Sequence, residues 1–466
     1  MNKRKQATKY IVSDFLSAFM SWLLFNIFRY TEIAFYLGFS SLKGYLLNVK
    51  VLEGQLVIPF FWIILYYFSG YYNKPFGKSR LSEFFTTLIT VVIGVTLLFF
   101  ILILNDLPHS FRTYYELYFA LVALQFILTY SFRLKITLKG LKKIKNREWT
   151  QNVLLIGAGN KAADMAKELY RLGYTIAGFI PEDRETPVDV DPGLVAGTLA
   201  DLPAIIPSGQ IDELVVIPES SESEKMVAIL YSLYHYSLPI KLLADKSNLF
   251  SKVKIRTIHG VPLIDVTDNN FSPFEKNIKF FLDKVLSVLI LICFSPLFLY
   301  IAWRVKRDSP GPVFFKQERI GYMGKPFIMY KFRTMYEGSE NRGPLLSYQN
   351  DSRVTPFGRI MRKYRLDEWA QFWNVLKGDM SIVGPRPERR YFIEQIVKKA
   401  PYYYLLHNVR PGITSWGMVK YGYAGDVDKM IERLEYDMLY YENMSLALDM
   451  TILLYTAKTV LTGKGI

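Results

Sequence analysis

Two adjacent carboxylates, Asp367 and Glu368, are the residues of this sequence with the clearest capacity for chemistry. Neighbouring acidic side chains can hold Mg²⁺ on a diphosphate, or supply a nucleophile beside a group that handles a proton. Most Asp-Glu pairs are only surface charge, so the pair needs support from its surroundings. Arg386 gives that support, because it lies between two prolines in the run Val-Gly-Pro-Arg-Pro-Glu. Its guanidinium is therefore predicted to be a preorganised hydrogen-bond donor to phosphate.

Further cations occur where the backbone is rigid or regular. Arg410 precedes Pro-Gly-Ile-Thr, and Lys331 and Arg333 end a short hairpin predicted over 313–333. On electrostatic grounds we predict that these three side chains, together with Arg386, bind the phosphate groups of a substrate.

The segment that carries the dyad is predicted to be helical. Apolar residues at 357, 360, 361 and 364 recur at helical spacing and are surrounded by arginine and lysine. Such an amphipathic helix suits an anionic bilayer surface, although a helix packed on its own core would show the same pattern. The following segment, 366–376, is expected to continue helically.

A long apolar segment, 285–303, precedes the dyad and is long enough to cross a bilayer. Ser295-Pro296 lies in its middle, where proline removes a backbone donor and bends a helix. Because both flanks are basic, we expect a hairpin that enters and leaves on one face, with a kinked crossing as the alternative. The later run 444–461, which Asp449 interrupts, is predicted to be a packed or surface-lying helix.

The first 145 residues are predicted to form a membrane module. Four apolar stretches, near 10–29, 55–72, 82–104 and 114–132, each have the roughly 20 residues that a membrane span requires. No small-residue cleavage site follows the first stretch, which argues against a cleaved signal peptide. Lysine and arginine gather before the first stretch, between the second and third, and after the fourth. The positive-inside rule therefore places both ends of the module in the cytoplasm.

The composition agrees with a membrane protein that has globular parts. The chain has 466 residues, 51% of them hydrophobic and 16% aromatic, which excludes a disordered or collagen-like chain. Its net charge of +15 indicates an anionic partner, but much of the excess flanks the apolar stretches, so nucleic acid is not needed as a partner. The single cysteine, Cys293, excludes an internal disulfide framework, and the four histidines have no metal-ligand spacing.

Residues 146–268 are predicted to form a Rossmann-like domain with a parallel, doubly wound sheet. Strands are expected over 153–156, 174–180 and 213–218. The turn Gly157-Ala-Gly159-Asn-Lys-Ala after the first strand could hold the pyrophosphate of a nucleotide, and Glu182 or Asp183 could bind its ribose. The glycines could equally serve only a tight turn. No hydride-transfer machinery accompanies them, so a regulatory or oligomer-contact role is favoured.

From residue 276 onward the sequence resembles the polyprenyl-phosphate hexose-1-phosphate transferases, the bacterial sugar transferases that prime exopolysaccharide and O-antigen synthesis. The likeness rests on four ordered blocks, PGPVFFKQERIG, YKFRTM, LDEWAQFWNVLKGDMSIVGPRP and RPGIT. A four-span front and a Rossmann-like middle resemble the long members, such as undecaprenyl-phosphate glucose phosphotransferase. The resemblance implies a catalytic domain over 269–466, a re-entrant helix broken at Ser295-Pro296, and soluble parts on the cytoplasmic side of the bacterial inner membrane.

The resemblance also implies a reaction, because the family's catalytic dyad falls on Asp367 and Glu368. The expected substrates are UDP-hexose, glucose before galactose, and undecaprenyl phosphate in the bilayer. Asp367 would attack the sugar-linked phosphorus, release UMP and carry the sugar phosphate until the lipid phosphate displaces it. Glu368 would help to bind Mg²⁺ or manage the proton, while Mg²⁺ and arginines offset phosphate charge.

Two other classes of function remain open at the level of sequence. A membrane-bound nucleotide-sugar oxidoreductase would use the Gly157 turn. A non-catalytic scaffold for polysaccharide assembly would not need the Asp367-Glu368 pair. The sequence does not decide which hexose is used, which ligand the Rossmann-like domain binds, or whether the chain forms a homodimer.

Overall fold

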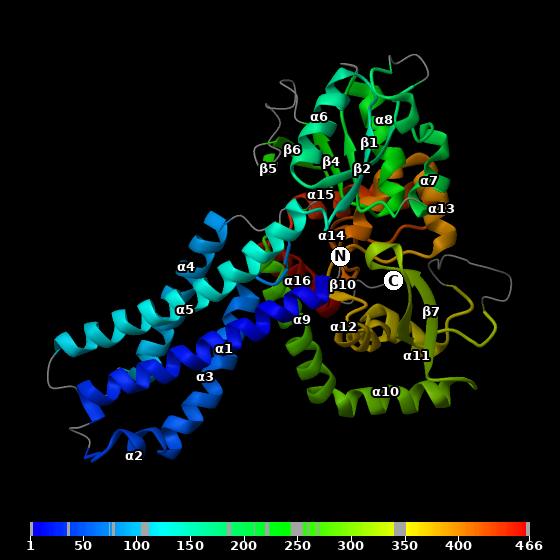
Figure 1. Cartoon of the computed structure of the whole chain (residues 1–466). Helices are drawn as coiled ribbons and strands as arrows, with labels where there is room; N and C mark the ends of the chain where they lie inside the picture. Colours follow the sequence, from blue (N-terminus) through cyan, green and yellow to red (C-terminus); the bar gives the residue numbers. More distant parts are fainter. Residues whose placement is uncertain are drawn as a thin grey trace. The chain divides into compact units, whose positions relative to one another are not determined.

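A computed structural model shows the chain as two compact units, Met1–Thr150 and Gln151–Ile466. The structure describes residues 3–34, 38–73, 75–76, 80–103, 111–183, 188–208, 210–219, 223–243, 255–258, 261–267, 269, 271–339 and 351–462. Helices predominate in these residues, together with a six-stranded mixed sheet (Figure 1). The mostly helical character and the α/β element agree with the predicted fold class.

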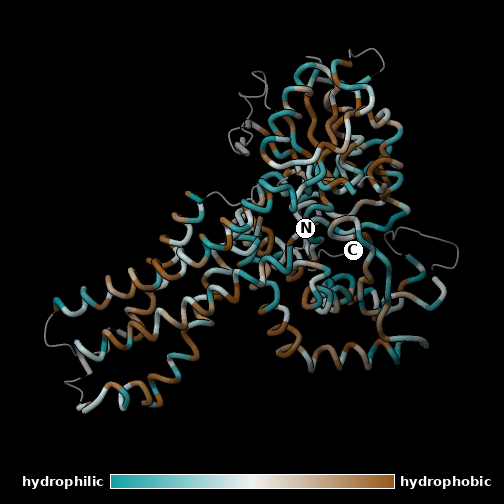
Figure 2. The backbone as a smooth tube through the Cα atoms, in the orientation of Figure 1, coloured by the Kyte–Doolittle hydropathy of each residue, from teal (hydrophilic) through white to brown (hydrophobic). Residues whose placement is uncertain are grey.

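The first unit is built from long apolar helices. Its elements are α1 (Lys3–Arg29), η1 (Tyr30–Ala34), α2 (Leu42–Leu46), α3 (Val49–Phe68), α4 (Arg80–Leu98), η2 (Phe99–Ile103) and α5 (Phe111–Lys145). Among the described residues, four helical segments are long and apolar enough to cross a membrane, and each overlaps one of the four predicted stretches. Hydrophobic residues run along these helices (Figure 2), and Phe60, Phe85 and Ile93 are more than half exposed. Four membrane-length helices are thus confirmed, whereas their orientation stays a prediction.

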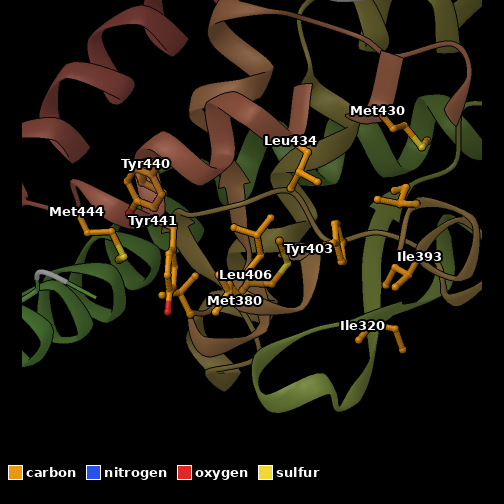
Figure 3. Packing of buried hydrophobic residues seen from close by; sticks show 14 of the residues in the cluster. Ile320, Met380, Ile393, Tyr403, Leu406, Met430, Leu434, Tyr440, Tyr441 and Met444 are labelled. Atoms are coloured by element: carbon orange, nitrogen blue, oxygen red, sulfur yellow. The ribbon is translucent and has the colours of Figure 1, made fainter. Parts of the chain in front are cut away.

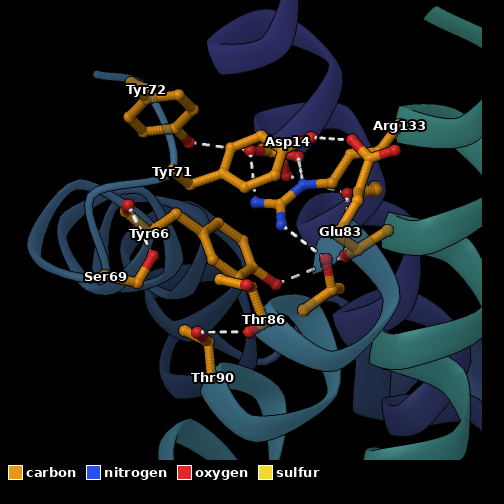
Figure 4. Close-up of polar contacts among 12 residues, drawn as sticks. Asp14, Tyr66, Ser69, Tyr71, Tyr72, Glu83, Thr86, Thr90 and Arg133 are labelled. Carbon is orange, nitrogen blue, oxygen red and sulfur yellow. Dashed lines mark hydrogen bonds and ion pairs between the residues drawn. The ribbon is translucent and has the colours of Figure 1, made fainter. Parts of the chain in front are cut away.

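A buried ion pair holds the interior of this bundle together (Figure 4). Arg133 on α5 bonds to Asp14 on α1 twice, from Nε to Oδ1 at 2.8 Å and from Nη2 to Oδ2 at 2.7 Å, and both side chains are fully buried. The guanidinium carbon lies 4.0 Å from the ring centre of Tyr66 and 3.5 Å from that of Tyr71. Nη1 donates to Thr87 Oγ1 at 2.9 Å. Because a charge in apolar surroundings is stable only when paired, this cluster ties α1, α3, α4 and α5 together.

The second unit begins with the sheet, here called the sheet region. Its elements are β1 (Gln151–Ile156), α6 (Asn160–Arg171), β2 (Tyr174–Ile180), η3 (Pro192–Leu194), η4 (Leu199–Asp201), α7 (Leu202–Ser208), β3 (Glu213–Val216), α8 (Ser223–Leu233), η5 (Tyr234–Tyr236), β4 (Ile240–Leu243), β5 (Ile255–Ile258) and β6 (Val261–Asp265). Leu154 and Val216 are buried on one face of the sheet, and Val153 and Val215 on the other. Burial on both faces explains the continuous apolar runs of these strands.

The sheet has the strand order β2-β1-β3-β4-β6-β5. Strands β1 to β4 pair in parallel, as predicted, but β6 is antiparallel to both β4 and β5. The prediction of a wholly parallel sheet is therefore wrong at this edge. The β5–β6 hairpin escaped sequence reasoning because its strands are short and Pro262 interrupts the alternating pattern that would reveal β6.

The rest of the second unit, here called the C-terminal region, surrounds a core of buried apolar residues that includes Ile320, Met380, Tyr403 and Leu406 (Figure 3). Its elements are α9 (Pro273–Cys293), α10 (Ser295–Asp308), β7 (Phe314–Ile320), η7 (Tyr322–Gly324), β8 (Pro326–Phe332), α11 (Pro356–Lys363), η8 (Leu366–Gln371), α12 (Phe372–Lys377), β9 (Ser381–Val383), α13 (Arg390–Lys399), η9 (Pro401–Asn408), β10 (Gly412–Thr414), α14 (Trp416–Lys420), α15 (Val427–Glu442) and α16 (Leu446–Leu461). The predicted hairpin is β7–β8, and the predicted C-terminal helix is α16. The division between the two regions near residue 268, which lies outside the described residues, stays a prediction.

The apolar helices α9 and α10 meet at a bend of 64°. The first ends at Cys293 and the second begins at Ser295, with Pro296 in its first turn, where a missing backbone donor costs little. Leu289, Ile292 and Leu299 are more than half exposed around the bend. A bent apolar pair of this kind is either a broken span or a re-entrant loop, so re-entry stays a prediction.

The segment before the dyad is not one continuous helix. Helix α11 ends at Lys363, Arg365 has a left-handed backbone with φ of 54°, and the chain then resumes as the 3₁₀ turns of η8. This break was not predicted. In α11, Phe357 and Met361 are buried against α10, whereas Ile360 is 52% exposed, so one face packs on the core and the other remains free for a surface.

Candidate active site

The dyad lies on η8, which begins immediately after the left-handed Arg365. Asp367 is 8% exposed and Glu368 is 7% exposed, and both line a cavity of about 670 Å³. The other walls include the β7–β8 hairpin, the segment 333–339 that follows it, the loop after β9 and helix α15. The break at Arg365 turns the chain inward, so both carboxylates point to this cavity and not to solvent.

Three cations converge on Glu368. Lys331 Nζ lies 2.9 Å from Oε1, Arg365 Nη2 lies 2.8 Å from Oε2, and Arg386 Nη1 lies 3.6 Å from Oε1. Burial alone raises the pKa of a carboxyl, but here Arg365, Lys331 and Arg386 outweigh burial and hold the pKa of Glu368 well below its usual value. Glu368 is therefore a permanently charged anchor for these cations.

Asp367 differs sharply from its neighbour. Within the described part of the chain its carboxylate has no hydrogen bond and no ion pair, although it is buried. Burial raises the pKa of Asp367, and the nearby Lys331 opposes that rise. A desolvated carboxylate without a hydrogen-bond partner is more nucleophilic than one that is held in ion pairs. The arrangement can therefore present one reactive oxygen beside a preassembled cluster of cations.

The structure brings together some of the predicted phosphate-binding residues and separates others. Lys331 and Arg386 lie in the cavity on Glu368. Arg333 also lines the cavity, but its guanidinium donates to the backbone carbonyls of Val305, Ser309 and Pro310, where it holds the end of α10. Phosphate binding by Arg333 stays a prediction, since these backbone contacts already engage its guanidinium.

Arg410 does not line the cavity. Its Nε donates to Gly378 O at 3.2 Å, and its guanidinium lies over the rings of Phe280 and Tyr322. The structure thus packs this side chain beside the end of α12, and phosphate binding by Arg410 stays a prediction that this geometry does not favour. A rigid Arg-Pro-Gly backbone fixes where the residue lies but not where its long side chain points.

Sequence reasoning missed several cavity residues. Arg365 is one of the cations around the predicted amphipathic helix, and its position two residues before the dyad is a signal that could have indicated contact with it. Glu388 bridges the partly buried Arg319, whose Nη1 lies at 3.2 Å, and the buried Arg433, whose Nη2 lies at 2.6 Å. Burial lowers the pKa of Arg319 to about 10. Arg433 belongs to α15, and no local sequence pattern marks it as a site residue. Only the fold brings it close to the loop after β9.

The residues present offer a limited set of ligands for Mg²⁺. No group of three or more His, Cys, Asp or Glu that could hold a metal occurs among the described residues. Asp367 has oxygen atoms to offer, whereas both oxygens of Glu368 are engaged by cations. Because Mg²⁺ is commonly held by one or two carboxylates together with substrate phosphates, the site fits a metal that arrives with a diphosphate.

The glycine-rich turn of the sheet region is closed by a carboxylate. Gly157 has φ of 128°, and the N–H of Gly159 donates to Glu219 Oε1 at 2.8 Å. The N–H of Glu219 in turn donates to Glu182 Oε1 at 2.9 Å. Burial raises the pKa of Glu219, and Glu182 adds to that rise. A pyrophosphate at this helix start would meet two carboxylates, so nucleotide binding here stays a prediction that the geometry does not favour.

Comparisons with known proteins agree on one family. Residues 274–463 match the family model described as bacterial sugar transferase. The UDP-glucose:undecaprenyl-phosphate glucose-1-phosphate transferase of Klebsiella pneumoniae is 32% identical over 409 residues, which are 84% of this chain and 86% of that protein. The enzyme of the same name from Escherichia coli (strain K12) is 32% identical over 322 residues, 67% of this chain and 68% of that protein.

A third relative is more similar over a shorter stretch. The UDP-N-acetylgalactosamine-undecaprenyl-phosphate N-acetylgalactosaminephosphotransferase of Aeromonas hydrophila is 44% identical over 217 residues. That stretch is 47% of this chain and 51% of the relative, so this chain spans about half the length of that relative.

Proposed function

This chain belongs to the bacterial sugar transferase family of phosphoglycosyl transferases, and from that premise we propose that it transfers hexose 1-phosphate from UDP-hexose to undecaprenyl phosphate. The observation that carries the proposal is the unequal dyad. Asp367 is buried and without a hydrogen bond or ion pair in the described chain, while the adjacent Glu368 holds three cations. Names of relatives support the two substrates, a UDP-sugar and undecaprenyl phosphate.

In the first step, a carboxylate oxygen of Asp367 attacks the sugar-linked phosphorus. A new oxygen–phosphorus bond forms, the bond to the bridging oxygen breaks, and UMP leaves with the electron pair. Lys331, Arg365 and Arg386 are positioned to offset the charge that develops on the phosphate oxygens. The sugar phosphate is then carried by Asp367 as an acyl phosphate.

In the second step, an oxygen of undecaprenyl phosphate attacks the same phosphorus. The bond to Asp367 breaks and the free carboxylate is restored, so each bond that forms is matched by one that breaks. One phosphoanhydride replaces another, and the overall reaction is close to balanced. Asp367 and the substrate phosphates would hold Mg²⁺ between them. The metal would then offset part of the negative charge of these groups.

Glucose is the proposed sugar, because two relatives that are 32% identical over 67% and 84% of the chain are named for UDP-glucose. A second candidate is N-acetylgalactosamine, because the relative named for it has 44% identity over 217 residues. Incubating membranes that contain the protein with UDP-glucose, UDP-galactose and the two UDP-N-acetylhexosamines, and measuring UMP release, decides between them. Release from UDP-N-acetylgalactosamine alone would overturn glucose.

The experiment that tests the proposed mechanism is an exchange reaction. Labelled UMP and UDP-hexose are incubated with the purified full-length protein in the absence of lipid phosphate. A covalent route through Asp367 predicts that label enters UDP-hexose, because the first step runs forward and backward by itself. Strict dependence of exchange on undecaprenyl phosphate would contradict this route and favour direct transfer in a ternary complex.

We also propose that the catalytic cavity faces the cytoplasm of a bacterial inner membrane. The 64° bend between α9 and α10 and the basic residues at both flanks support a helix pair that returns to one face. Accessibility of a single introduced cysteine in α16 to a membrane-impermeant thiol reagent tests this, in a Cys293→Ser background. Labelling from the periplasmic side would overturn the orientation.

A further inference from the structure

The sheet region contacts the C-terminal region through a patch of aromatic rings. Tyr231 of α8 lies 5.8 Å from Tyr402 of η9, measured between ring centres, and His235 of η5 lies 4.9 Å from Tyr404. Tyr234 packs against the core of the sheet region and also against the core of the C-terminal region. A side chain shared by two cores makes this a packed contact.

A second contact fixes the chain that joins the two regions. The carbonyl oxygen of Thr267 accepts a hydrogen bond from Tyr441 Oη at 2.7 Å and another from Asn408 Nδ2 at 3.4 Å. Asn408 is the last residue of η9. The sheet region therefore meets η9 at its first turn through Tyr402, in its middle through Tyr404, and at its end through Asn408.

The other side of η9 faces the loop that carries Arg386. Pro385, Arg386 and Pro387 share the walls of a small cavity of about 10 Å³ with Tyr403, Leu406, His407 and other residues. Both Tyr403 and Leu406 point into the core of the C-terminal region (Figure 3). The loop thus rests on η9 with little space between them, and a shift of η9 would be passed on to the loop.

The strand that follows η9 is bonded to the same loop. Gly412 N donates to Pro385 O at 2.9 Å, and Gly384 N donates to Thr414 O at 3.0 Å. Through this loop Arg386 reaches Glu368, with Nη1 3.6 Å from Oε1. The 3₁₀ helix η9 and the strand β10 that follows it therefore link the sheet region to a cation of the site.

We propose that the sheet region positions the Arg386 loop, with Tyr231, Tyr234 and His235 acting as positioning residues for the transfer reaction. The inference rests on the proposed function, in which Arg386 stabilises substrate phosphate. Because the strength of such an interaction depends on placement within fractions of an ångström, support from behind the loop affects the rate without touching substrate. The glycine turn agrees with this role, since the N–H of Gly159 already donates to Glu219.

The kinetic test uses full-length protein in lipid nanodiscs and measures UMP exchange. Tyr231→Ala combined with His235→Ala is expected to lower kcat/KM for UDP-hexose about three- to ten-fold, the range typical of coupling through packed side chains. His235→Phe, used in place of His235→Ala, keeps a ring against Tyr404 and is expected to recover most of the lost kcat/KM. The matched control is Tyr170→Ala, which removes a 51% exposed ring from α6 and should leave kcat/KM unchanged.

A double-mutant cycle with Arg386→Lys tests whether the effect passes through Arg386. In the Arg386→Lys background the interface substitutions are expected to lower kcat/KM by less than about two-fold, because the correct placement of Arg386 is already lost. Fully additive losses would overturn the inference, and so would unchanged kcat/KM in Tyr231→Ala/His235→Ala.

Hydrogen exchange gives a readout that does not depend on activity. The amides of the loop from Gly384 to Glu388 are expected to exchange faster in the interface variant than in wild type or in Tyr170→Ala. Unchanged exchange of this loop would overturn the inference even if the enzyme works as proposed. If Asp367→Asn retained UMP exchange, the proposed mechanism would fail instead, and the loop measurement would still decide whether the sheet region supports the loop.

Discussion

Two of the clusters of carboxylates and cations in the described residues, one in the helical bundle and one in the C-terminal region, differ in completeness. In the bundle, Arg133 and Asp14 form a matched pair with two hydrogen bonds, enclosed by tyrosine rings, and neither side chain is exposed. In the C-terminal region, three cations share Glu368, while Asp367 has no ion pair in the described chain and borders a cavity.

The difference shows how a buried charge cluster reveals its role. A saturated pair sealed from solvent can stabilise a fold but offers nothing to a ligand. An unsaturated cluster, with surplus cations and one free carboxylate beside a cavity of about 670 Å³, is costly to maintain unless a ligand completes it. Substitutions in the two clusters should therefore separate stability from catalysis.

The largest effect is expected for Asp367→Asn. An amide cannot form the acyl phosphate, so UMP exchange should fall by at least about 1,000-fold while the fold persists. The matched control is Asp428→Asn, which neutralises an exposed aspartate on α15. Exchange near the wild-type rate in Asp367→Asn would remove this residue from its role.

Substitutions in the Arg133–Asp14 pair of the bundle are expected to lower the stability of the protein and not its catalytic activity. Arg133→Leu leaves Asp14 buried without its partner, which should lower the free energy of unfolding by about 3–5 kcal/mol. The double variant Asp14→Leu/Arg133→Leu leaves no unpaired charge and should be less destabilised than the single variant. Thermal unfolding in detergent measures both, and UMP exchange by the folded fraction should stay near wild type. Loss of exchange in well-folded Arg133→Leu would mean that this cluster also takes part in function.

A smaller effect is expected when Glu368, which holds the three cations of the C-terminal region, is neutralised. Glu368→Gln keeps the shape but releases the charge that holds Lys331, Arg365 and Arg386 together, so kcat/KM should fall about 10- to 100-fold. Glu394→Gln, an exposed position on α13, serves as the control. A loss as complete as that of Asp367→Asn would show that Glu368 does chemistry itself and not only positions cations.

The smallest effect concerns the pH dependence of stability that comes from His407, which lies beside the Arg386 loop. Burial, with a contribution from His235, lowers the pKa of His407 to about 4, whereas an exposed histidine titrates near 6.5. The unfolded chain therefore binds more protons than the folded chain between these values, and stability falls as pH falls. The loss between pH 7 and pH 5 should be about 2 kcal/mol.

Thermal unfolding across this pH range in His407→Phe measures that loss. Because phenylalanine has no proton to gain, the variant should show a flatter dependence of stability on pH than wild type. Equal dependence in the two proteins would assign the acid sensitivity to other groups.

Local sequence was sufficient for part of the fold, whereas the roles of the predicted site residues stay predictions. Four membrane-length helices follow from apolar length alone, and the dyad with Arg386 follows from residue types at short spacing. Lys331 and Arg386 do meet Glu368, because a strand end and a proline-framed loop leave their side chains few directions. Short-range constraints of this kind can be read from a sequence.

The features that were missed depend on distant residues or on side-chain direction. Glu219 closes the glycine turn from 60 positions away in the chain, and Arg433 reaches Glu388 from a helix 45 positions further on. Arg410 turns toward Gly378 and away from the cavity. The left-handed Arg365 that separates α11 from η8 has its guanidinium bonded to Glu368, a contact that only the folded backbone makes visible.

The central claim is that the sugar phosphate is carried on Asp367 between the two steps. The most direct measurement is to incubate the protein with UDP-hexose while UMP is removed, quench in acid, digest, and analyse the peptides by mass spectrometry. The account predicts that the peptide containing Asp367 gains the mass of one hexose phosphate, and that Asp367→Asn gains none. A protein that turns over UDP-hexose and lipid phosphate but never shows this adduct would contradict it.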